Sequence, residues 1–503
     1  MKKSVKLVLP AVLAIVMLAA GCSPKASTNS PAAAASNSPA ASQSEAAATA
    51  AEIETSANNE VVTVKWEQLG DKPANYDTWI SELNDYIGPQ YGINADVDFI
   101  SNADYANRSS VIVQSGEYFD MIYTNTSNYV PNVRMGAYMD ISDLAKTAAP
   151  DLYKYIPEDI WEASTVDGKI YGVPTYKDCA ATLVMVWDRD LTDQAGLNIN
   201  DYTTFTSIVE PLTKIKDETG QPSLIVDDGG VSGLINPIYD DMGTALTAVG
   251  VRYDDTSRTA GFTLEQPDVM AGLKAIREMY QSGVINADAP TIHETPDKKP
   301  FFIAQGWVSA AKTIWGPNGD YNAEAVVMGD PIINNSTVRG SINAVYSGSK
   351  YPEQALQMLQ VANLDVKVRD MFYYGLEGEN FNYTADNKVE KLSTDWQVAA
   401  YAQATFFTVT PLADVEINQW DEIKELNEIA QAGTLLGFSF DTSSIETELA
   451  NCRDIMSKYK AELMTGAIDP EETVAQIKAE MENVGLNNIL EEAQKQIDAA
   501  NFS

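Results

Sequence analysis

Histidine and cysteine are almost missing from this chain of 503 residues. It has one histidine, His293, and three cysteines, Cys22, Cys179 and Cys452. Transition-metal sites are usually built from several such side chains, so no convincing site can be assembled, and neither a metal nor another cofactor is expected. Cys179 and Cys452 could form a disulfide if the chain is exported. Two separate buried thiols are the favoured interpretation.

Basic residues are scarce as well. The chain has 34 Lys and Arg against 71 Asp and Glu, which gives a formal net charge of −37. Such a charge repels phosphate backbones and anionic membrane surfaces, so nucleic-acid binding is not expected. The acidic doublets Asp227-Asp228, Asp240-Asp241 and Asp254-Asp255 lack the spacing and the glycine of a dedicated calcium loop. We therefore interpret them as solvated surface.

Recognisable catalytic motifs are missing too. The sequence contains no GxSxG, no HExxH and no glycine-rich phosphate loop, so no catalytic residue is predicted. The only long apolar run extends from Leu7 to Ala20 after a basic start and is interrupted by Pro10. It is too short to span a membrane in the mature protein and is typical of a signal peptide.

This run ends in Leu18-Ala19-Ala20-Gly21-Cys22, which resembles the lipobox of bacterial lipoproteins. The resemblance implies cleavage after residue 21 and lipidation of Cys22; an ordinary signal peptide with a chance cysteine is the alternative. Residues 22–60 then form a tract of Ala, Ser, Pro, Asn and Thr that is expected to be a disordered linker. The remaining residues, about 440, exceed one compact core, so two or more domains are expected.

What is present is an alternation of strand and helix patterns. The expected elements, in order, are strands at Val61–Trp66, Ala95–Ile100 and Phe119–Tyr123, with helices at Tyr76–Ile87 and Arg108–Gln114 between them. This order predicts a parallel sheet with helices on both faces. Ligands bind such sheets beyond the carboxyl ends of the strands, which indicates the loops at Asp71, Asn125 and Tyr176.

The C-terminal third is strongly helical. An apolar stripe runs through Ile445, Leu449, Cys452, Met456, Tyr459 and Leu463. Ser443 to Glu446 has the pattern of a capping box in front of this stripe. Asp469 followed by Pro470 predicts the start of the next helix, with the aspartate as its N-cap. Farther upstream, a strand is expected at Ala181–Trp187 and a helix at Val269–Tyr280.

Seven segments carry a family resemblance through their order and spacing. They are Trp66–Lys72, Gln114–Ile122, Lys169–Asp178, Val184–Leu191, Phe302–Trp315, Ile342–Ala355, and the region from Leu435–Asp441 through Asp469–Glu471. The first six together resemble the extracellular solute-binding proteins of ABC sugar importers, the maltose-binding-protein-like family. The seventh resembles the C-terminal domain of a Firmicutes subgroup of lipoprotein-type binding proteins.

This resemblance implies an α/β, two-lobed, periplasmic-binding-protein-like fold of type II. Each lobe is expected to use discontinuous chain, with crossings near residues 175–178 and 331–339. The expected boundaries are a signal peptide at 1–21, a lipid-anchored linker at 22–60, an N-terminal lobe of 61–176 plus 337–376, a C-terminal lobe of 177–336 plus 377–440, and a helical region at 441–503 packed on the C-terminal lobe.

The resemblance also implies a function. A monomeric protein, lipid-anchored on the extracellular face of the bacterial cell membrane, would capture a sugar or oligosaccharide. It would deliver this ligand to the permease subunits of an ABC transporter and would not be an enzyme. Two alternatives stay open. The same fold could bind a peptide or another non-sugar ligand, and a surface glycosidase could use one of the abundant carboxylate pairs.

Sugar binding needs aromatic platforms for the ring faces and hydrogen-bonding groups for the hydroxyls. The matched loops offer both. The candidate ligand contacts are Asp71, Lys72, Asn125, Tyr176, Lys177, Asp178 and Asn343, with Trp315 and Trp420 as stacking residues. Each has a structural alternative: the tryptophans could be core, Lys177 and Asp178 a solvated pair, and Asp71 the cap of the helix that follows it.

Overall fold

The computed structural model describes residues 61–413, 415 and 417–502, so Cys22 and the predicted linker lie outside the described part. The first region contains β1 (Val62–Leu69), α1 (Tyr76–Tyr91), β2 (Ile93–Ile100), α2 (Tyr105–Ser115), β3 (Met121–Thr124), α3 (Tyr129–Arg134), α4 (Leu144–Ala148), α5 (Pro150–Tyr155), α6 (Glu158–Ser164) and β4 (Gly172–Pro174). The expected strand–helix alternation is therefore confirmed here.

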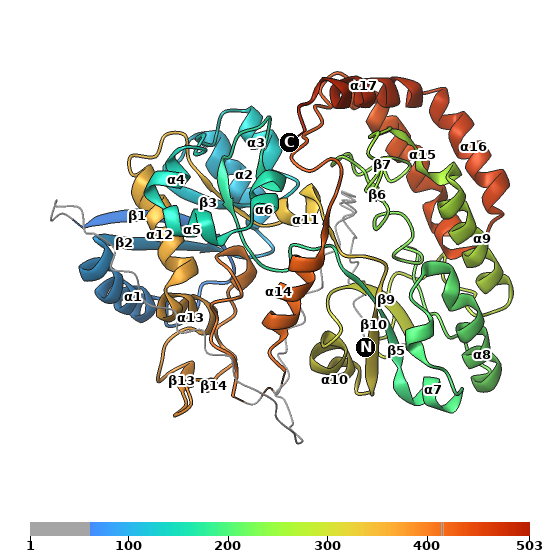
Figure 1. The fold of residues 1–503 in the computed structure, drawn as a ribbon, viewed down its shortest axis with the longest axis horizontal. Coiled ribbons are helices and arrows are strands. Elements are labelled where there is room, and N and C mark those ends of the chain that lie inside the picture. The colour runs from blue at the N-terminus through green and yellow to red at the C-terminus, as the bar shows by residue number, and fades with distance from the viewer. Residues whose placement is uncertain (1–60, 414, 416, 503) are drawn as a thin grey trace, which may run out of the picture. The chain divides into compact units, whose positions relative to one another are not determined.

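A five-stranded sheet has the order β2-β1-β3-β12-β4, where β12 spans Ile342–Val345 (Figure 1). β1 pairs in parallel with both β2 and β3, which confirms the predicted parallel arrangement. β12 is antiparallel to both β3 and β4. A strand that follows β4 by more than 160 residues thus lies inside the sheet that the first strands begin.

Helices cover both faces of this sheet. On one face Val64 and Trp66 of β1 pack with residues of α1, α12 (Pro352–Leu364) and α13 (Val366–Tyr374). On the other face Leu69 and Ile122 pack with residues of α2 and α3. The stripe predicted for α1 is buried at Trp79, Leu83 and Ile87, as its 3.6-residue period requires.

A second sheet has the order β10-β5-β9 and is antiparallel throughout. The elements from this region onward are β5 (Leu183–Asp188), α7 (Arg189–Gln194), α8 (Val209–Thr219), β6 (Tyr239–Asp240), β7 (Val249–Arg252), β8 (Gly261–Phe262), α9 (Pro267–Gln281), β9 (Phe301–Gln305), α10 (Gly316–Gly319), β10 (Ala323–Met328), β11 (Ile332–Ile333) and α11 (Asn335–Arg339). The chain therefore leaves the first sheet after β4 and re-enters it at β12. The exact lobe boundaries stay a prediction.

After α13 come the hairpin of β13 (Phe381–Tyr383) and β14 (Val389–Lys391), then α14 (Gln419–Ile429), then β15 (Gln431–Ala432). β15 pairs in parallel with β11, which lies about 100 residues earlier in the chain. A short 3₁₀ turn, Ala400–Ala402, precedes α14. No helix in the described part of the chain is long and apolar enough to cross a membrane.

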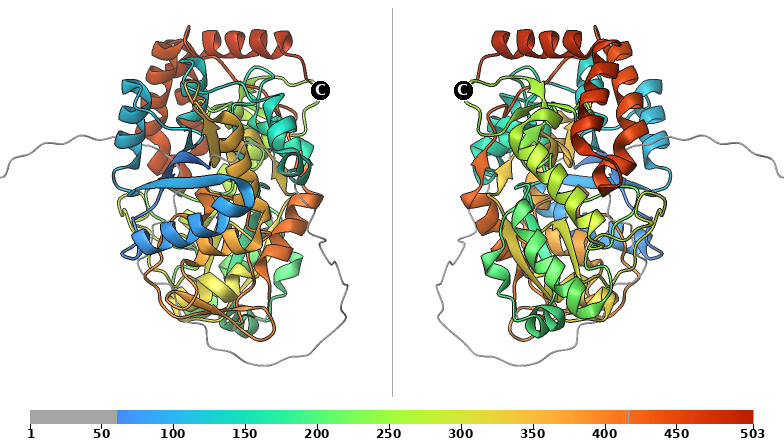
Figure 2. Two further views of the ribbon diagram at one scale, coloured as in Figure 1. Left: turned by 90° about the vertical axis from the view of Figure 1, so that its left-hand side faces the viewer. Right: turned by 90° about the vertical axis from the view of Figure 1, so that its right-hand side faces the viewer.

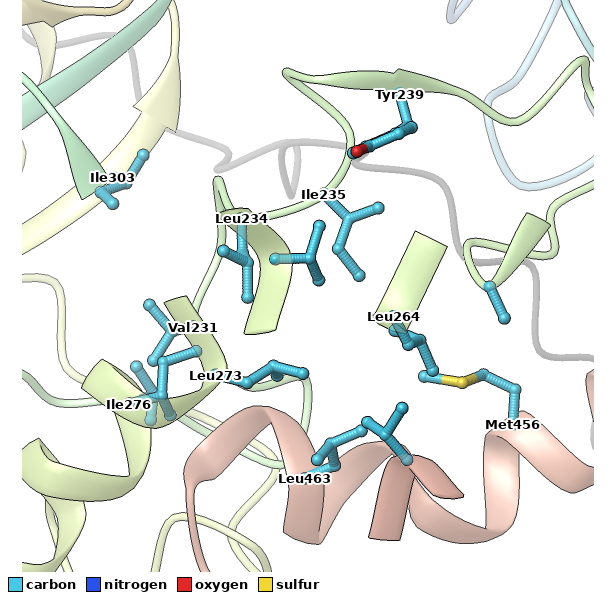
Figure 3. Close-up of a cluster of buried hydrophobic side chains, with 14 of the residues drawn as sticks. Val231, Leu234, Ile235, Tyr239, Leu264, Leu273, Ile276, Ile303, Met456 and Leu463 are labelled. Carbon is cyan, nitrogen blue, oxygen red and sulfur yellow. The ribbon is translucent and has the colours of Figure 1, made fainter. Parts of the chain in front are cut away.

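The chain ends in α15 (Glu446–Thr465), α16 (Pro470–Glu482) and α17 (Leu486–Ala499). α15 and α16 pack against α9, and the right-hand view of Figure 2 faces this group of helices. Figure 3 shows Met456 and Leu463 of α15 pointing into the same apolar cluster as Leu273 and Ile276 of α9. The predicted stripe of α15 is buried along its whole length, which confirms its interpretation as core.

The caps of these helices follow the sequence only in part. The Asp469 carboxylate accepts a hydrogen bond from the Glu472 amide, so the predicted N-cap of α16 is confirmed. The predicted capping box at Ser443–Glu446 is wrong, because α15 begins at Glu446 after Ile445 and has no side-chain cap bond. The Ser443 amide donates instead to the Asp441 carboxylate. Asp441 therefore takes the backbone N–H that the Glu446 side chain would accept in a capping box.

Candidate functional site

The register of the first sheet brings several predicted site residues to one edge. β1, β2 and β3 all end there, with Leu69 beside Ile100. The antiparallel β12 begins at the same edge, since Ile342 pairs with both Thr124 and Pro174. The loops that start at Gly70, Ser101, Asn125 and Thr175 therefore leave the sheet on one side, where doubly wound α/β folds place their ligands.

A pocket of about 640 Å³ opens at this edge beyond β1 and β2. Its lining is formed by Asp71, Lys72, Asp98, Phe99, Ile100, Ser101, Asp104, Asn107, Arg108 and Val111. Small-molecule sites typically have about 300–1,000 Å³, so the volume suits a small ligand or part of a larger one. Charged and amide side chains dominate the lining and offer donors and acceptors to hydroxyl groups.

Asp71 and Lys72 are both exposed at this pocket. Asp71 does not cap α1, because the N-cap position belongs to Asn75. The Lys72 ammonium lies 4.0 Å from the centre of the Tyr76 ring, a cation–π contact that holds the lysine over the start of α1. Asn125, half-buried at the end of β3, accepts a hydrogen bond from the Ser127 amide with its side-chain oxygen.

The segment that leaves β4 carries the next three candidates. Tyr176 is buried, with its ring 4.7 Å from that of Phe407. The Lys177 ammonium and the Asp178 carboxylate form an ion pair of 2.6 Å. Burial is the largest influence and lowers the pKa of Lys177, but attraction to Asp178 and Cys179, the hydrogen bond to Asp178 and attraction to Tyr401 together raise it above its ordinary value. Lys177 is therefore a charged, mostly buried group and not a solvated one.

Asn343 of β12 is 1% exposed and fully engaged inside the protein. Its oxygen accepts hydrogen bonds from Trp66 Nε1 at 3.0 Å and Gln68 Nε2 at 2.7 Å. Its nitrogen donates to the carbonyl oxygens of Ala402 and Gln403. All the hydrogen-bonding positions of this amide are thus used to join β1, β12 and the segment around residue 402.

The two predicted stacking tryptophans pack against other aromatic rings. Trp420 of α14 is 9% exposed and stacks on Phe406 with ring centres 4.5 Å apart. Trp315 is half-buried and edge-on to Phe302 at 5.6 Å, in the region of the second sheet. Neither ring lines the pocket beyond β1 and β2. Ligand contact by any of the nine predicted residues stays a prediction.

Two residues of this region carried no interpretable sequence signal. Asn427 of α14 accepts a hydrogen bond from the Ala180 amide and donates to the Lys177 carbonyl, so it clamps the segment after β4. Tyr401, in the 3₁₀ turn, is 41% exposed beside Tyr123. Their neighbours lie hundreds of residues away in the chain, and only the folded structure brings them together.

No group of three or more His, Cys, Asp or Glu side chains among the described residues could hold a metal ion. Cys179 and Cys452 are both buried and unpaired, which confirms the expectation of separate thiols. Burial raises the pKa of the Cys179 thiol to about 12, so it stays protonated and a poor nucleophile near neutral pH.

Comparisons with known proteins agree with this architecture. A carbohydrate ABC transporter substrate-binding protein of Streptococcus pneumoniae is 25% identical over 453 residues, which cover 86% of this chain and 90% of that protein. The crystal structure of the N-glycan transport solute binding protein NgtS, also from S. pneumoniae, superposes with a TM-score of 0.77 at 22% identity, covering 87% and 98% of the two chains. An extracellular solute-binding protein from Bifidobacterium longum subsp. infantis gives a TM-score of 0.59 at 13% identity, covering 88% and 99%.

Two family models match. One, described as a domain of unknown function (DUF3502), covers residues 434–501, the part that contains α15, α16 and α17. The other covers residues 88–400, well over half of the chain, and is described as bacterial extracellular solute-binding protein. The chain therefore belongs to the family of bacterial extracellular solute-binding proteins, which are binding proteins and not enzymes.

Proposed function

We propose that this protein captures a sugar or oligosaccharide and delivers it to an ABC transporter. The observation that carries the proposal is the shared strand edge, where Asp71 and Lys72 line the pocket beyond β1 and β2 and the chain that carries the Lys177–Asp178 pair leaves β4. Carboxylate, ammonium and amide groups can satisfy sugar hydroxyls that would otherwise be buried without partners.

The names of similar proteins support the same ligand class. The pneumococcal NgtS is an N-glycan transport protein and was crystallised in complex with Man5GlcNAc. The sequence relative from S. pneumoniae is described as a carbohydrate ABC transporter substrate-binding protein. An anionic ligand would favour an arginine cluster, whereas the pocket lining contains the single arginine Arg108, which already pairs with Glu117 at 2.9 Å.

A ligand screen tests this proposal. Thermal unfolding of the protein is measured with monosaccharides, oligosaccharides that include Man5GlcNAc, and short peptides. A ligand that binds only the native state raises the apparent stability, by about 2.7 kcal/mol at one hundred times its Kd. We expect a shift with at least one neutral sugar. Shifts with peptides alone would contradict the sugar assignment and leave the family membership intact.

Asp71 gives the matched test of the site. Asp71→Ala should weaken sugar binding by about 1–3 kcal/mol in calorimetry, because a sugar hydroxyl loses its charged acceptor. Asp85→Ala, which removes an exposed carboxylate from α1 outside the pocket lining, is the control and should bind like the wild type. Equal affinities for all three proteins would show that the ligand does not reach this pocket.

The proposed location is the outer face of the cell membrane, with a lipid on Cys22 as the anchor. Support comes from the lipobox-like segment that ends at Cys22 after a basic and apolar start. Cys22→Ala should abolish lipid labelling and release the protein or leave it unprocessed, as metabolic labelling and fractionation of cells would reveal. Unchanged labelling of the variant would contradict the anchor.

A further inference from the structure

The segment from Val398 to Thr405 crosses the ligand edge of the first sheet and is held there by its backbone. Val398 forms an isolated bridge with Gly70, directly before Asp71. Five of its carbonyl groups accept side-chain hydrogen bonds from Ser341, Asn343 or Arg369: those of Ala400, Tyr401, Ala402, Gln403 and Thr405. Asn343 and Arg369 are almost fully buried, so these anchors are fixed by the core.

Tyr401 is the exposed side chain of this anchored segment. Its ring is 41% exposed, whereas Ala402, Gln403, Ala404 and Thr405 are buried. An exposed aromatic ring makes few apolar contacts within the protein, so contact with a ligand is favourable. Because the backbone beneath Tyr401 is rigid, the protein loses little conformational freedom when a ligand binds. Trp315 and Trp420, by contrast, pack on other rings of the protein.

Tyr401 has a buried tyrosine beside it, Tyr123, whose hydroxyl donates to the Gly340 carbonyl. The Tyr123 ring, at the end of β3, lies 6.4 Å away at 82°. Burial raises the pKa of the Tyr401 phenol, and the nearby Lys177 ammonium and the Tyr123 hydroxyl lower it in part. Lys177 holds Asp178 in its ion pair. The Ser341 hydroxyl bonds both the Tyr401 carbonyl and the Thr175 hydroxyl, two residues before Lys177, so Tyr401 and the Lys177–Asp178 segment lie in the same region of the edge.

We propose that Tyr401 is the aromatic platform on which a sugar ring of the ligand stacks, with Lys177 and Asp178 on the neighbouring segment to bind hydroxyls of the ligand. This inference rests on the proposed sugar-binding function and moves the platform from the two tryptophans to a tyrosine. The combination of an apolar face with flanking donors and acceptors is what a pyranose ring requires.

The test compares three variants by calorimetry with Man5GlcNAc, or with the first sugar of the panel that shifts the thermal unfolding of the wild type. Tyr401→Ala should lower the affinity about tenfold or more, whereas Tyr401→Phe, which keeps the ring, should stay within about threefold. Tyr351→Ala is the matched control, because Tyr351 is 38% exposed at the start of α12, and it should bind like the wild type.

A spectroscopic measurement separates stacking from a structural role. A ring that covers a sugar face shifts the resonances of the sugar C–H protons upfield, so this shift should appear with wild type and Tyr401→Phe and be lost with Tyr401→Ala. Sugar binding that is equal in all variants would overturn the platform and leave the proposed function standing. If the wild type binds no sugar, or binds peptides alone, both proposals fall.

Discussion

At the scale of single residues, the amide of Asn343 shows how a polar group can be essential without facing a ligand. It joins Trp66 and Gln68 of β1 to the backbone at Ala402 and Gln403, and it is 1% exposed. The anchored segment that presents Tyr401 depends on these bonds. A buried amide with four partners is costly to remove, because each partner left behind stays without water.

We predict that Asn343→Leu destabilises the protein by about 3 kcal/mol or more, since two donors and two carbonyl oxygens become unpaired in the core. Urea unfolding monitored by circular dichroism measures the loss. Asn200→Ala, at an exposed asparagine that bonds only within its own loop, should change stability little. A stable Asn343 variant that has lost only sugar binding would instead support direct ligand contact.

At the scale of elements, α14 connects three separate parts of the chain. Its Glu422 carboxylate accepts hydrogen bonds from the backbone amides of Val308 and Ser309, which follow β9 of the second sheet. Its Asn427 clamps the segment between β4 and β5 at Lys177 and Ala180. Trp420, on the same helix, packs into an aromatic cluster with Phe406. The position of the Lys177–Asp178 pair therefore depends on this helix.

We predict that Asn427→Ala costs about 1–3 kcal/mol of stability, because the Ala180 amide and the Lys177 carbonyl lose their buried partner. Sugar affinity should fall as well, since Lys177 is no longer fixed beside Tyr401. Chemical unfolding and calorimetry check the two effects. Glu425→Ala, on the exposed face of the same helix, controls for helix propensity. Wild-type behaviour of both variants would show that the clamp does not position this segment.

Periodic sequence patterns made the helices and strands predictable, whereas the tertiary contacts of the site could not be predicted. The stripe of α1 and the Asp469 cap of α16 each rest on residues a few positions apart, and both are observed. Trp420 gives the same signal on an amphipathic helix whether it is core or platform, so its burial could not be foreseen. The clamp by Asn427 joins residues about 250 positions apart, and no local pattern encodes such a contact.

The sheet edge that carries the candidate site, by contrast, could be predicted from local patterns. Asp71 and Asn125 follow strands that a simple period identifies, and strand–helix alternation fixes which ends of parallel strands meet. The second sheet was less accessible. It is antiparallel, and its strands β5 and β9 are separated by more than 100 residues that include α7, α8, α9 and a further small sheet, so register, not hydrophobic period, determines its pairing.

At the scale of the whole molecule, charge and burial act together on stability. The net charge of −37 already disfavours the compact state through self-repulsion. Several buried carboxyl groups add to this. Burial, followed by the neighbouring Asp241 carboxylate, raises the pKa of Asp240 to about 6, and Asp240 is 8% exposed on β6. The Asp240-Asp241 doublet is thus partly buried, and its interpretation as solvated surface is wrong.

The sign of the resulting pH dependence follows from linkage. Unfolded Asp240 titrates near its ordinary value of 3.8, whereas the folded group titrates at about 6, so the folded state binds the proton more tightly. The stabilisation of the folded state by protonated Asp240 is fully present below the unfolded pKa and is lost as pH rises through about 6. The free energy of unfolding falls by about 3 kcal/mol over this whole range. We therefore predict that unfolding stability is greater at pH 5 than at pH 8.

Asp240→Asn tests this prediction because it removes the titrating group and keeps the shape of the side chain. The variant should gain stability over the wild type at pH 8, where the wild-type carboxylate is ionised, and the gain should shrink or reverse at pH 5, where that carboxyl is mostly protonated. Asp85→Asn changes the net charge equally at an exposed position of α1, so it isolates the contribution of burial from that of self-repulsion. Urea unfolding of the three proteins at four pH values between 5 and 8 measures how the free energy of unfolding depends on pH in each. Parallel curves for Asp240→Asn and Asp85→Asn would mean that overall charge, and not the buried carboxyl, sets the pH dependence of this fold.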